Sequence, residues 1–138
     1  MASDTDRGRK ARAERQLREE LVIWLTTTST DGTPQPNPVW FIPDGDDIIV
    51  YSHRNAVRNR NIQRNNRISL NFNIDPHDEH VTVITGTAAI DPTIPPPNTS
   101  RAYMEKYGEY IPGIDMTPES YAETFSVGLR IIPGKIRD

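Results

Sequence analysis

The sequence predicts a mainly β fold, a small antiparallel barrel of six strands with a few inserted helices. Short segments rich in β-branched and aromatic residues recur along the chain, and tight turn signals join most of them. Parallel strands need crossovers of a dozen or more residues, so this order disfavours a parallel sheet. The 138 residues suffice for one domain, residues 1–138, with a helix in residues 1–20 and the barrel with its inserted helices in residues 21–138.

The first two elements are predicted to be a helix and a buried strand. Residues 7–20 are strong helix formers of mixed charge, and few of them are apolar. We expect this helix to bury only a narrow stripe around Ala11, Leu17 and Leu21. Residues 21–28, LVIWLTTT, are β-branched and aromatic, which is typical of a buried strand.

The return strand is expected over residues 34–42, PQPNPVWFI, after a hairpin turn at Asp31-Gly32. Its interior prolines, Pro36 and Pro38, cannot donate to a ladder. The strand should therefore be irregular or face a ligand on one side. The alternative is a core strand whose prolines protect an edge.

Two aromatic residues end this return strand. Side chains alternate along a strand, so Trp40 and Phe41 should lie on opposite faces. One can then serve the core while the other faces a ligand or a partner. Pro38 and Val39 add a flat apolar surface suited to a tricyclic ring. The candidate polar contacts to the edge of such a ring are Gln35 and Asn37.

The remaining elements follow from local turn and cap signals. Further strands are expected over residues 47–52, 67–74, 81–90 and 124–132, with turns at residues 44–46 and 75–80. Gly86 indicates a bulge or a close approach of another backbone. We expect a rigid proline-rich connector over residues 91–98 and a helix over residues 99–107. Thr117 is expected to cap a further helix that starts at Pro118.

The segment from Tyr51 to Leu70 has five arginines and no acid, although the net charge of the chain is −3. A local excess of this size indicates a bound anion. The alternative is a solvated basic face that pairs with acids elsewhere, such as those in residues 75–79.

Within this segment, Arg58, Arg60 and Asn61 form a candidate phosphate site. Arginine is suited to bidentate phosphate contacts. A helix that begins near Asn55 would add the positive field of its free N–H groups. Ser52, at the end of the preceding strand, could add a hydroxyl donor.

Composition disfavours several other classes of protein. The chain has no cysteine, which excludes disulfides and thiolate chemistry and agrees with a reducing cytoplasm. No apolar run approaches the roughly 18 residues of a membrane span, and the charged N-terminus lacks a signal-peptide core. We therefore expect a soluble, cytoplasmic protein. The negative net charge and the lack of an RNA-binding aromatic motif disfavour a nucleic-acid partner.

No metal site or nucleophilic triad is expected. His77 and His80 flank an acidic turn that lacks the spacing of a helical metal motif. The serines lack a nucleophile-elbow pattern. Four tyrosines could stack on a cofactor, although aromatic residues between helices usually only pack together. These tyrosines are Tyr103, Tyr107, Tyr110 and Tyr121.

Two segments, in this order and spacing, resemble the pyridoxamine 5′-phosphate oxidase-like split β-barrel proteins, most of all the branch that uses the deazaflavin coenzyme F420. The first is TTTSTDGTPQPNPVWFIPDGDDIIVYS, a strand–turn–strand unit with a proline-rich return. The second is RNRNIQRNNRISLNF, which is similar to the family's basic segment. The resemblance runs from Leu21 to Ile90 and, more weakly, through the final strand. It implies a six-stranded split barrel of the FMN-binding type.

The family's roles fall on matching positions of this chain. The strand from Gln35 to Trp40 would lie along the ring, Ser52 would sit at the phosphate end, and Arg58 would stand where relatives carry a phosphate-binding Lys or Arg. The implied cofactor-binding residues are Gln35, Asn37, Pro38, Val39, Trp40, Ser52, Arg58, Arg60 and Asn61. The basic N-terminal helix could approach the oligoglutamate tail of the coenzyme. Family members are homodimers with the cofactor at the interface, which agrees with the low apolar fraction of 35%.

The resemblance implies a coenzyme F420-dependent oxidoreductase, in which hydride passes from the reduced cofactor to an unsaturated small molecule. Water or a tyrosine would supply the proton, and no catalytic residue is assigned. An FMN-dependent oxidoreductase and a non-catalytic F420-binding protein are the alternatives. Vitamin B6 oxidation is disfavoured because the family's C-terminal substrate-phosphate segment is missing. Haem degradation is disfavoured because no histidine can be assigned as a haem ligand.

Overall fold

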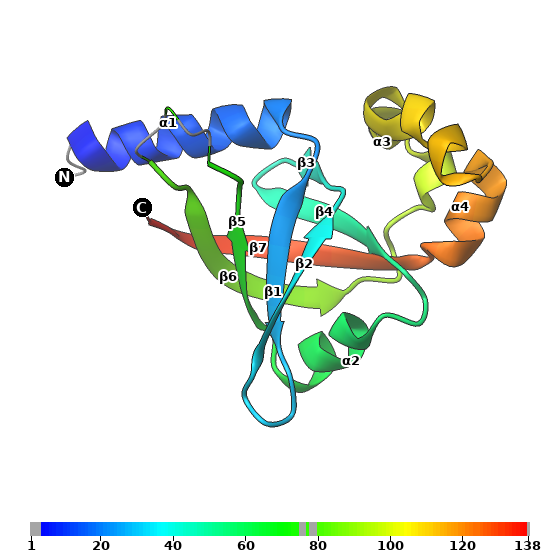
Figure 1. Cartoon of the computed structure of the whole chain (residues 1–138), viewed down its shortest axis with the longest axis horizontal. Coiled ribbons are helices and arrows are strands. Elements are labelled where there is room, and N and C mark those ends of the chain that lie inside the picture. The colour runs from blue at the N-terminus through cyan, green and yellow to red at the C-terminus, as the bar shows by residue number, and fades with distance from the viewer. Residues whose placement is uncertain (1–3, 75–76, 78–79, 138) are drawn as a thin grey trace.

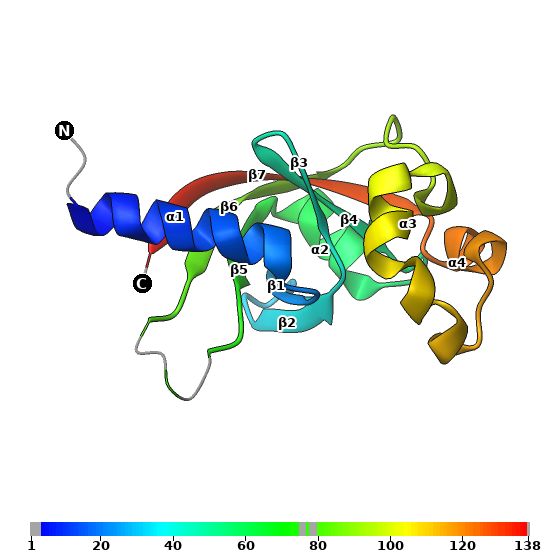
Figure 2. The same ribbon diagram turned by 90° about the horizontal axis from the view of Figure 1, so that it is seen from above.

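The computed structural model describes residues 4–74, 77 and 80–137, which form one curved sheet with helices around it (Figures 1 and 2). All strand pairs are antiparallel, in the order β2-β1-β5-β6-β7-β4-β3. The predicted mainly β split-barrel class is therefore confirmed. The strands of the described residues are β1 (Ile23–Thr28), β2 (Pro34–Val39), β3 (Ile42–Asp44), β4 (Asp47–Ser52), β5 (Arg67–Asn71), β6 (Val83–Ile90) and β7 (Val127–Arg137).

Helices lie at both ends of the sheet. They are α1 (Asp4–Glu19), α2 (Val57–Arg64), α3 (Arg101–Tyr107) and α4 (Pro118–Thr124). Short 3₁₀ turns over Gly108–Tyr110 and Pro112–Ile114 connect α3 to α4. In both views α1 covers one end of the sheet, and α3 and α4 lie together at the other end (Figures 1 and 2). No helix of the described part of the chain is long and apolar enough to cross a membrane.

The described residues form seven strands instead of the predicted six, because the return strand is broken at Trp40 and Phe41. The Phe41 N–H donates to the Tyr107 hydroxyl oxygen over 2.9 Å. The Phe41 carbonyl oxygen lies 2.9 Å from the Tyr107 hydroxyl and also accepts from Lys106 Nζ over 2.9 Å. Side chains of α3 thus satisfy the backbone groups that a ladder would otherwise use. The prediction of one continuous strand to Ile42 was wrong for this reason.

The apolar stripe of α1 also differs from expectation. Ala13 is buried and Leu17 is half-buried, whereas Ala11 and Leu21 are exposed. Residues four apart share a helix face, so Ala13 and Leu17 point to the sheet together. Ala11 belongs to a different face, and Leu21 lies beyond the end of the helix.

Local turn and cap predictions are confirmed. Gly32 and Gly45 adopt positive φ in their turns. Thr117 caps α4 through a reciprocal capping box with Ser120, and Pro118 is the first helical residue. Because α4 continues to Thr124, the final strand begins only at residue 127 and not at residue 124 as expected.

Gly86 marks a close approach of two backbones, as predicted. The register of β6 against β7 shifts between Thr85 and Gly86. A Cβ atom at Gly86 would lie 2.2 Å from the Ile132 carbonyl oxygen, a distance that no real contact tolerates. Only glycine therefore fits this crossing of β6 and β7.

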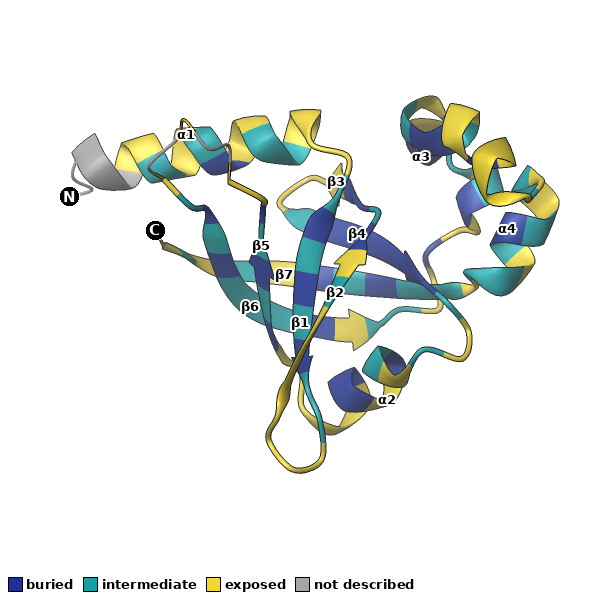
Figure 3. Ribbon diagram, viewed as in Figure 1, coloured by how far each residue is buried: buried dark blue, intermediate teal, exposed yellow. Residues whose placement is uncertain are grey.

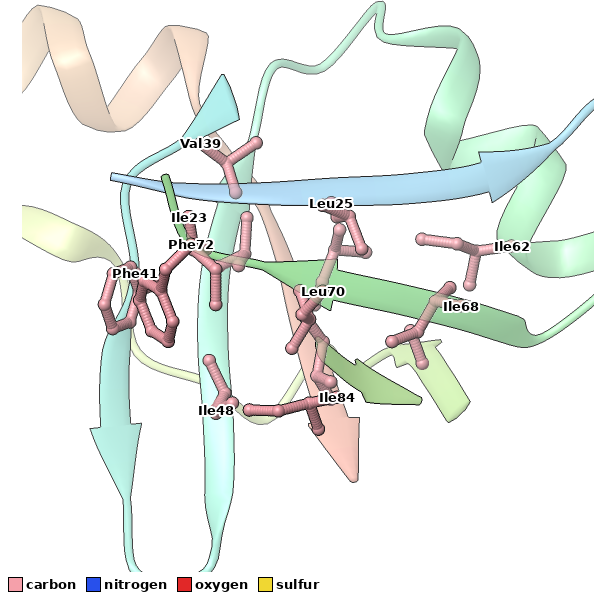
Figure 4. Packing of buried hydrophobic residues seen from close by; sticks show 14 of the residues in the cluster. Ile23, Leu25, Val39, Phe41, Ile48, Ile62, Ile68, Leu70, Phe72 and Ile84 are labelled. Atoms are coloured by element: carbon pink, nitrogen blue, oxygen red, sulfur yellow. The ribbon is translucent and has the colours of Figure 1, made fainter. Parts of the chain in front are cut away.

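Two apolar clusters hold the molecule together. The first fills the barrel between its strands and α1 and α2, and Figure 4 labels ten of its members. Phe41 belongs to this cluster and is fully buried. The second cluster packs α3 and α4 against β3 and β4. Its aromatic members are Trp40, Tyr51, Tyr103, Tyr107, Tyr121 and Phe125. Trp40 and Phe41 thus point into different clusters, as the alternation predicted.

Candidate functional site

A groove runs along the open edge of β2. This strand ends the sheet and pairs only with β1 among the described strands, and most of its residues are exposed (Figure 3). Two neighbouring hollows follow it. The aromatic hollow has a volume of about 190 Å³ and is lined by Pro38, Val39, Trp40, Tyr51, Arg58, Ile114, Tyr121 and Phe125. The basic hollow has a volume of about 540 Å³ and is lined by residues 34–37 and 56–58. Because Arg58 lines both, we treat the two as one edge groove.

The hydrogen bonds of β2 leave a row of carbonyl groups on this edge. Residues of an antiparallel strand alternate between pairs that exchange two hydrogen bonds and pairs whose N–H and C=O groups point away from the neighbour. Proline has no N–H, so Pro34, Pro36 and Pro38 must occupy pairs of the second kind opposite β1. Their carbonyl oxygens therefore point out of the sheet. Within β2, the open edge carries acceptors and no backbone donor.

The aromatic hollow has an apolar wall of stacked rings. Trp40 stacks on Tyr107 with ring centroids 4.6 Å apart and on Tyr121 at 5.6 Å. Tyr121 in turn stacks on Phe125 at 4.4 Å. These rings come from the end of β2 and from α3 and α4, so the packing of the helices onto the sheet builds the wall. A flat apolar ring fits such a surface.

The tyrosine hydroxyls of this wall are engaged within the protein. Tyr121 Oη lies 2.6 Å from Tyr103 Oη, and Tyr51 Oη donates to the Pro95 carbonyl over 2.6 Å. Burial raises the pKa of Tyr121 to about 12 and also raises the pKa values of Tyr51 and Tyr103. These hydroxyls are therefore neutral near pH 7, and each already has a protein partner.

The basic end of the groove depends on Arg58. Its Nε donates to Ser52 Oγ over 2.9 Å, and Ser52 is fully buried. Among the described residues, this is the one hydrogen bond of the Arg58 side chain, and no carboxylate pairs with it. Burial lowers the pKa of Arg58 because desolvation penalises its charge. A half-buried cation with free guanidinium N–H groups is suited to a phosphate.

Asn61 lies behind the groove and fixes its neighbours. The side chain is buried, and its Nδ2 donates to Gln35 Oε1 over 2.7 Å and to Thr27 Oγ1 over 3.1 Å. Its Oδ1 accepts from Arg64 over 3.0 Å. Asn61 therefore fixes the side chain of Gln35, which lines the groove, and its own polar atoms are already engaged in this structure.

Arg60 lies apart from Arg58. It lines a separate hollow of about 370 Å³ together with Arg54 and Gln63. Residues two apart on a helix point about 200° away from each other, so α2 presents Arg58 and Arg60 on different sides. Of the predicted site residues, the structure brings together in the edge groove Gln35, Asn37, Pro38, Val39, Trp40 and Arg58, with Ser52 directly behind Arg58.

Five groove residues were not expected from the sequence: Tyr51, Ala56, Val57, Ile114 and Phe125. Tyr121 and Phe125 are four apart, and the Phe125 N–H at the end of α4 donates to the Tyr121 carbonyl oxygen, so this spacing is a signal that could have paired them. Ile114 lies in an irregular turn, and no pattern in the sequence points to it. The acidic turn around His77 and His80 lies partly outside the described residues, and the described residues contain no group of three candidate metal ligands.

The antiparallel sheet defines a protein of the split-barrel class, with an edge groove that is cationic at one end and aromatic-walled at the other. The chain belongs to the pyridoxamine 5′-phosphate oxidase family, because the model of that family matches residues 10–137. No curated protein matches the sequence.

Solved structures share this fold. One, named F420 reductase, is 25% identical, with a TM-score of 0.66, over 90% of this chain and 94% of its own. A Listeria innocua protein, provisionally described as a pyridoxamine 5′-phosphate oxidase, is 20% identical, with a TM-score of 0.65, over 93% and 95%. The heme storage protein HutZ from Vibrio cholerae is 13% identical, with a TM-score of 0.62, over 91% and 90%. The last two show the fold alone.

Proposed function

We propose that this chain is a coenzyme F420-dependent oxidoreductase that holds the deazaflavin in the edge groove and reduces an unsaturated small molecule. The observation that carries the proposal is Arg58, a half-buried cation whose one protein partner in the described chain is Ser52. The similarity to a structure named F420 reductase supports the choice of cofactor. The absence of cysteine agrees with a reducing cytoplasm as the place of the reaction.

The residues of the groove fit a flat ring that carries a phosphate. Arg58, held by Ser52, offers its guanidinium to the phosphate. Pro38, Val39 and Trp40 offer the apolar surface for the ring. Of the two residues also assigned to the phosphate by resemblance, Asn61 acts indirectly in this proposal by holding Gln35, and Arg60 faces a separate hollow on the far side of α2, without a direct contact.

The chemistry needs no nucleophile from the protein. When bound, the reduced cofactor supplies the hydride, and the protein contributes position and a dry surface. The proton that completes the reduction comes from water in this proposal, because the hydroxyls of Tyr51 and Tyr121 already have partners within the chain.

A second copy of the chain would complete the site. Both hollows of the groove are partly open, so one chain does not enclose a bound ring. Ile114 and Val57 stand at the two hollows with 45% and 51% of their surface exposed. We therefore propose a homodimer that covers these apolar side chains and closes the groove.

Titration of the apo-protein with F420 and, separately, with FMN tests the function, with ligand fluorescence as the readout. We expect micromolar or tighter binding of F420 and weaker binding of FMN. Arg58→Ala should weaken F420 binding by roughly 10- to 100-fold, the value of charge-assisted hydrogen bonds to a phosphate. Arg60→Ala is the matched control and should change the affinity by less than about twofold, since an exposed charge at that distance is screened.

The other outcomes separate the alternatives. A preference for FMN would move the protein to the flavin-dependent branch of the same fold. Tight F420 binding without oxidation of reduced F420 by any of a panel of unsaturated molecules would favour a non-catalytic carrier. Binding of neither cofactor would overturn the proposal.

A further inference from the structure

The edge of β2 is unusual because prolines occupy all three positions whose backbone groups point away from β1. At Pro34, Pro36 and Pro38 the carbonyl oxygens point out of the sheet along the edge groove, and β2 itself places no N–H beside them. An ordinary edge strand presents N–H and C=O groups in alternation, and so serves donors and acceptors equally. This edge can accept hydrogen bonds along its length but cannot donate one from its backbone.

The two candidate ring systems differ in what they present to such an edge. A flavin has a nitrogen at position 5 of its central ring, and the lone pair of that nitrogen is a hydrogen-bond acceptor in the oxidised state. A 5-deazaflavin has a C–H group there, with no lone pair. An acceptor held against a row of carbonyl oxygens stays unpaired, whereas a polarised C–H can make a weak C–H···O contact.

We infer that the proline carbonyl row of β2 selects a 5-deazaflavin over a flavin, because β2 offers no backbone donor to the part of the ring that lies against it. This inference rests on the proposed function, in which the ring lies in the edge groove. Arg58 contributes nothing to the choice, since both cofactors carry a phosphate. The selection instead lies in the backbone of Pro36 and Pro38, which line the part of the groove between the basic end and the aromatic wall.

The ladder to β1 does not depend on these prolines. Residues 35, 37 and 39 exchange the hydrogen bonds with β1, because they occupy the alternate pairs. Pro36→Ala and Pro38→Ala therefore leave the sheet paired and each restore one outward N–H. An alanine has more freedom in the unfolded chain than a proline, so each substitution should lower the stability of the fold only slightly.

The test measures the affinities of F420 and FMN for the wild type and for Pro36→Ala and Pro38→Ala, by ligand fluorescence. In at least one variant, the preference for F420 over FMN should fall by about tenfold, the value of pairing one buried acceptor, chiefly through tighter FMN binding. Pro43→Ala, in β3 and outside the edge groove, is the matched control and should leave the ratio unchanged. Thermal unfolding of each variant verifies that the fold is intact.

The failures of the two proposals are distinguishable. If both cofactors bind and neither groove variant changes their ratio, the selection by the proline row is overturned while the cofactor site stands. A wild type that prefers FMN also overturns the selection, because the row would then disfavour the preferred ring. If neither cofactor binds the wild type, the proposed function falls and this inference falls with it.

Discussion

Arg58 is half-buried, and no carboxylate of the described residues pairs with its guanidinium. Its neighbour Ser52 orients Nε but does not neutralise the guanidinium. Sequence predicted both Arg58 and Arg60 for one phosphate, because the two stand in one basic run. The structure separates them, since a helix turns about 100° per residue. Which of the two faces the groove depends on how α2 docks against β1 and β6, and this docking cannot be read from the basic run alone.

Tyr121 is the residue that best tests the source of the proton. Tyr121→Phe removes the hydroxyl that pairs with Tyr103 and leaves the stacked ring in place. We expect the free energy of unfolding to fall by about 1–3 kcal/mol, because a buried hydroxyl of Tyr103 loses its partner. The oxidation rate of bound reduced F420 should change by less than about threefold, measured by stopped-flow with the best acceptor of a substrate panel. A loss of roughly 100-fold, the usual contribution of a general acid, would make Tyr121 the proton donor.

Lys106 gives the protein a pH dependence on the alkaline side. Its Nζ donates to the Phe41 carbonyl and lies 3.7 Å from the centre of the Phe41 ring. Burial lowers the pKa of Lys106 to about 8, against a smaller opposing effect of Glu20. Between this pH and about pH 10 the unfolded chain keeps the lysine proton while the folded chain releases it. The free energy of unfolding should therefore rise with pH over this window.

Lys106→Met keeps most of the side-chain volume and removes the titrating group. Urea unfolding at pH 7.5, just below that window, and at pH 8.5 and 9.5, within it, should show a shallower rise in the free energy of unfolding for the variant than for the wild type. Above about pH 10 the tyrosines of the unfolded chain begin to ionise, so the comparison ends there. Equal slopes for the two proteins would show that Lys106 titrates normally.

Among the elements, turns and caps were predicted well and the strand break was not. The Asp31-Gly32 turn, the Thr117 cap and the Gly86 crossing each follow from residues close together in the sequence. The break after Val39 depends on Tyr107, which is 66 residues from Phe41 in the chain. A local pattern of β-forming residues continues through the break, so nothing in the strand itself predicts it.

Gly86→Ala should show how much the crossing of β6 and β7 contributes to the fold. The new Cβ would lie 2.2 Å from the Ile132 carbonyl oxygen, and backbone atoms of β7 would have to move. We expect a loss of at least about 1–3 kcal/mol in the free energy of unfolding, the usual effect of overpacking. Gly113→Ala is the control, because a Cβ atom there would have no atom within 4 Å beyond its chain neighbours and its φ is not in the left-handed region. A similar, small loss for both variants would contradict the steric explanation of Gly86.

At the scale of the whole molecule, one chain forms the edge groove but encloses it only in part. Two copies would account for the apolar side chains that stand exposed at its rim. The sequence suggested a partner through its low apolar fraction, but composition carries no information on which face the partner covers. Because Val57 and Ile114 are exposed at the edge groove, we expect the partner to cover that face.

The proposed dimer is testable by light scattering coupled to size exclusion. We expect a mass of twice the 15.6 kDa of one chain. Val57→Asp should shift the protein toward the monomer and weaken F420 binding, because it places a charge at the rim and near the phosphate end. Ile74→Asp is the control, since Ile74 is 47% exposed and lines neither hollow. A wild type that is monomeric at micromolar concentration would rule out the dimer.

The position of Trp40 in the groove wall also provides an intrinsic fluorescence signal for binding. The chain has two tryptophans, and Trp40 forms part of the groove wall, whereas the Trp24 indole donates to Asn73 and lines neither hollow. In a Trp24→Phe variant all indole emission would come from Trp40, in the groove wall against which the ring would lie in the proposed function. Quenching of that emission would then report the arrival of any ligand, including colourless substrates that have no signal of their own.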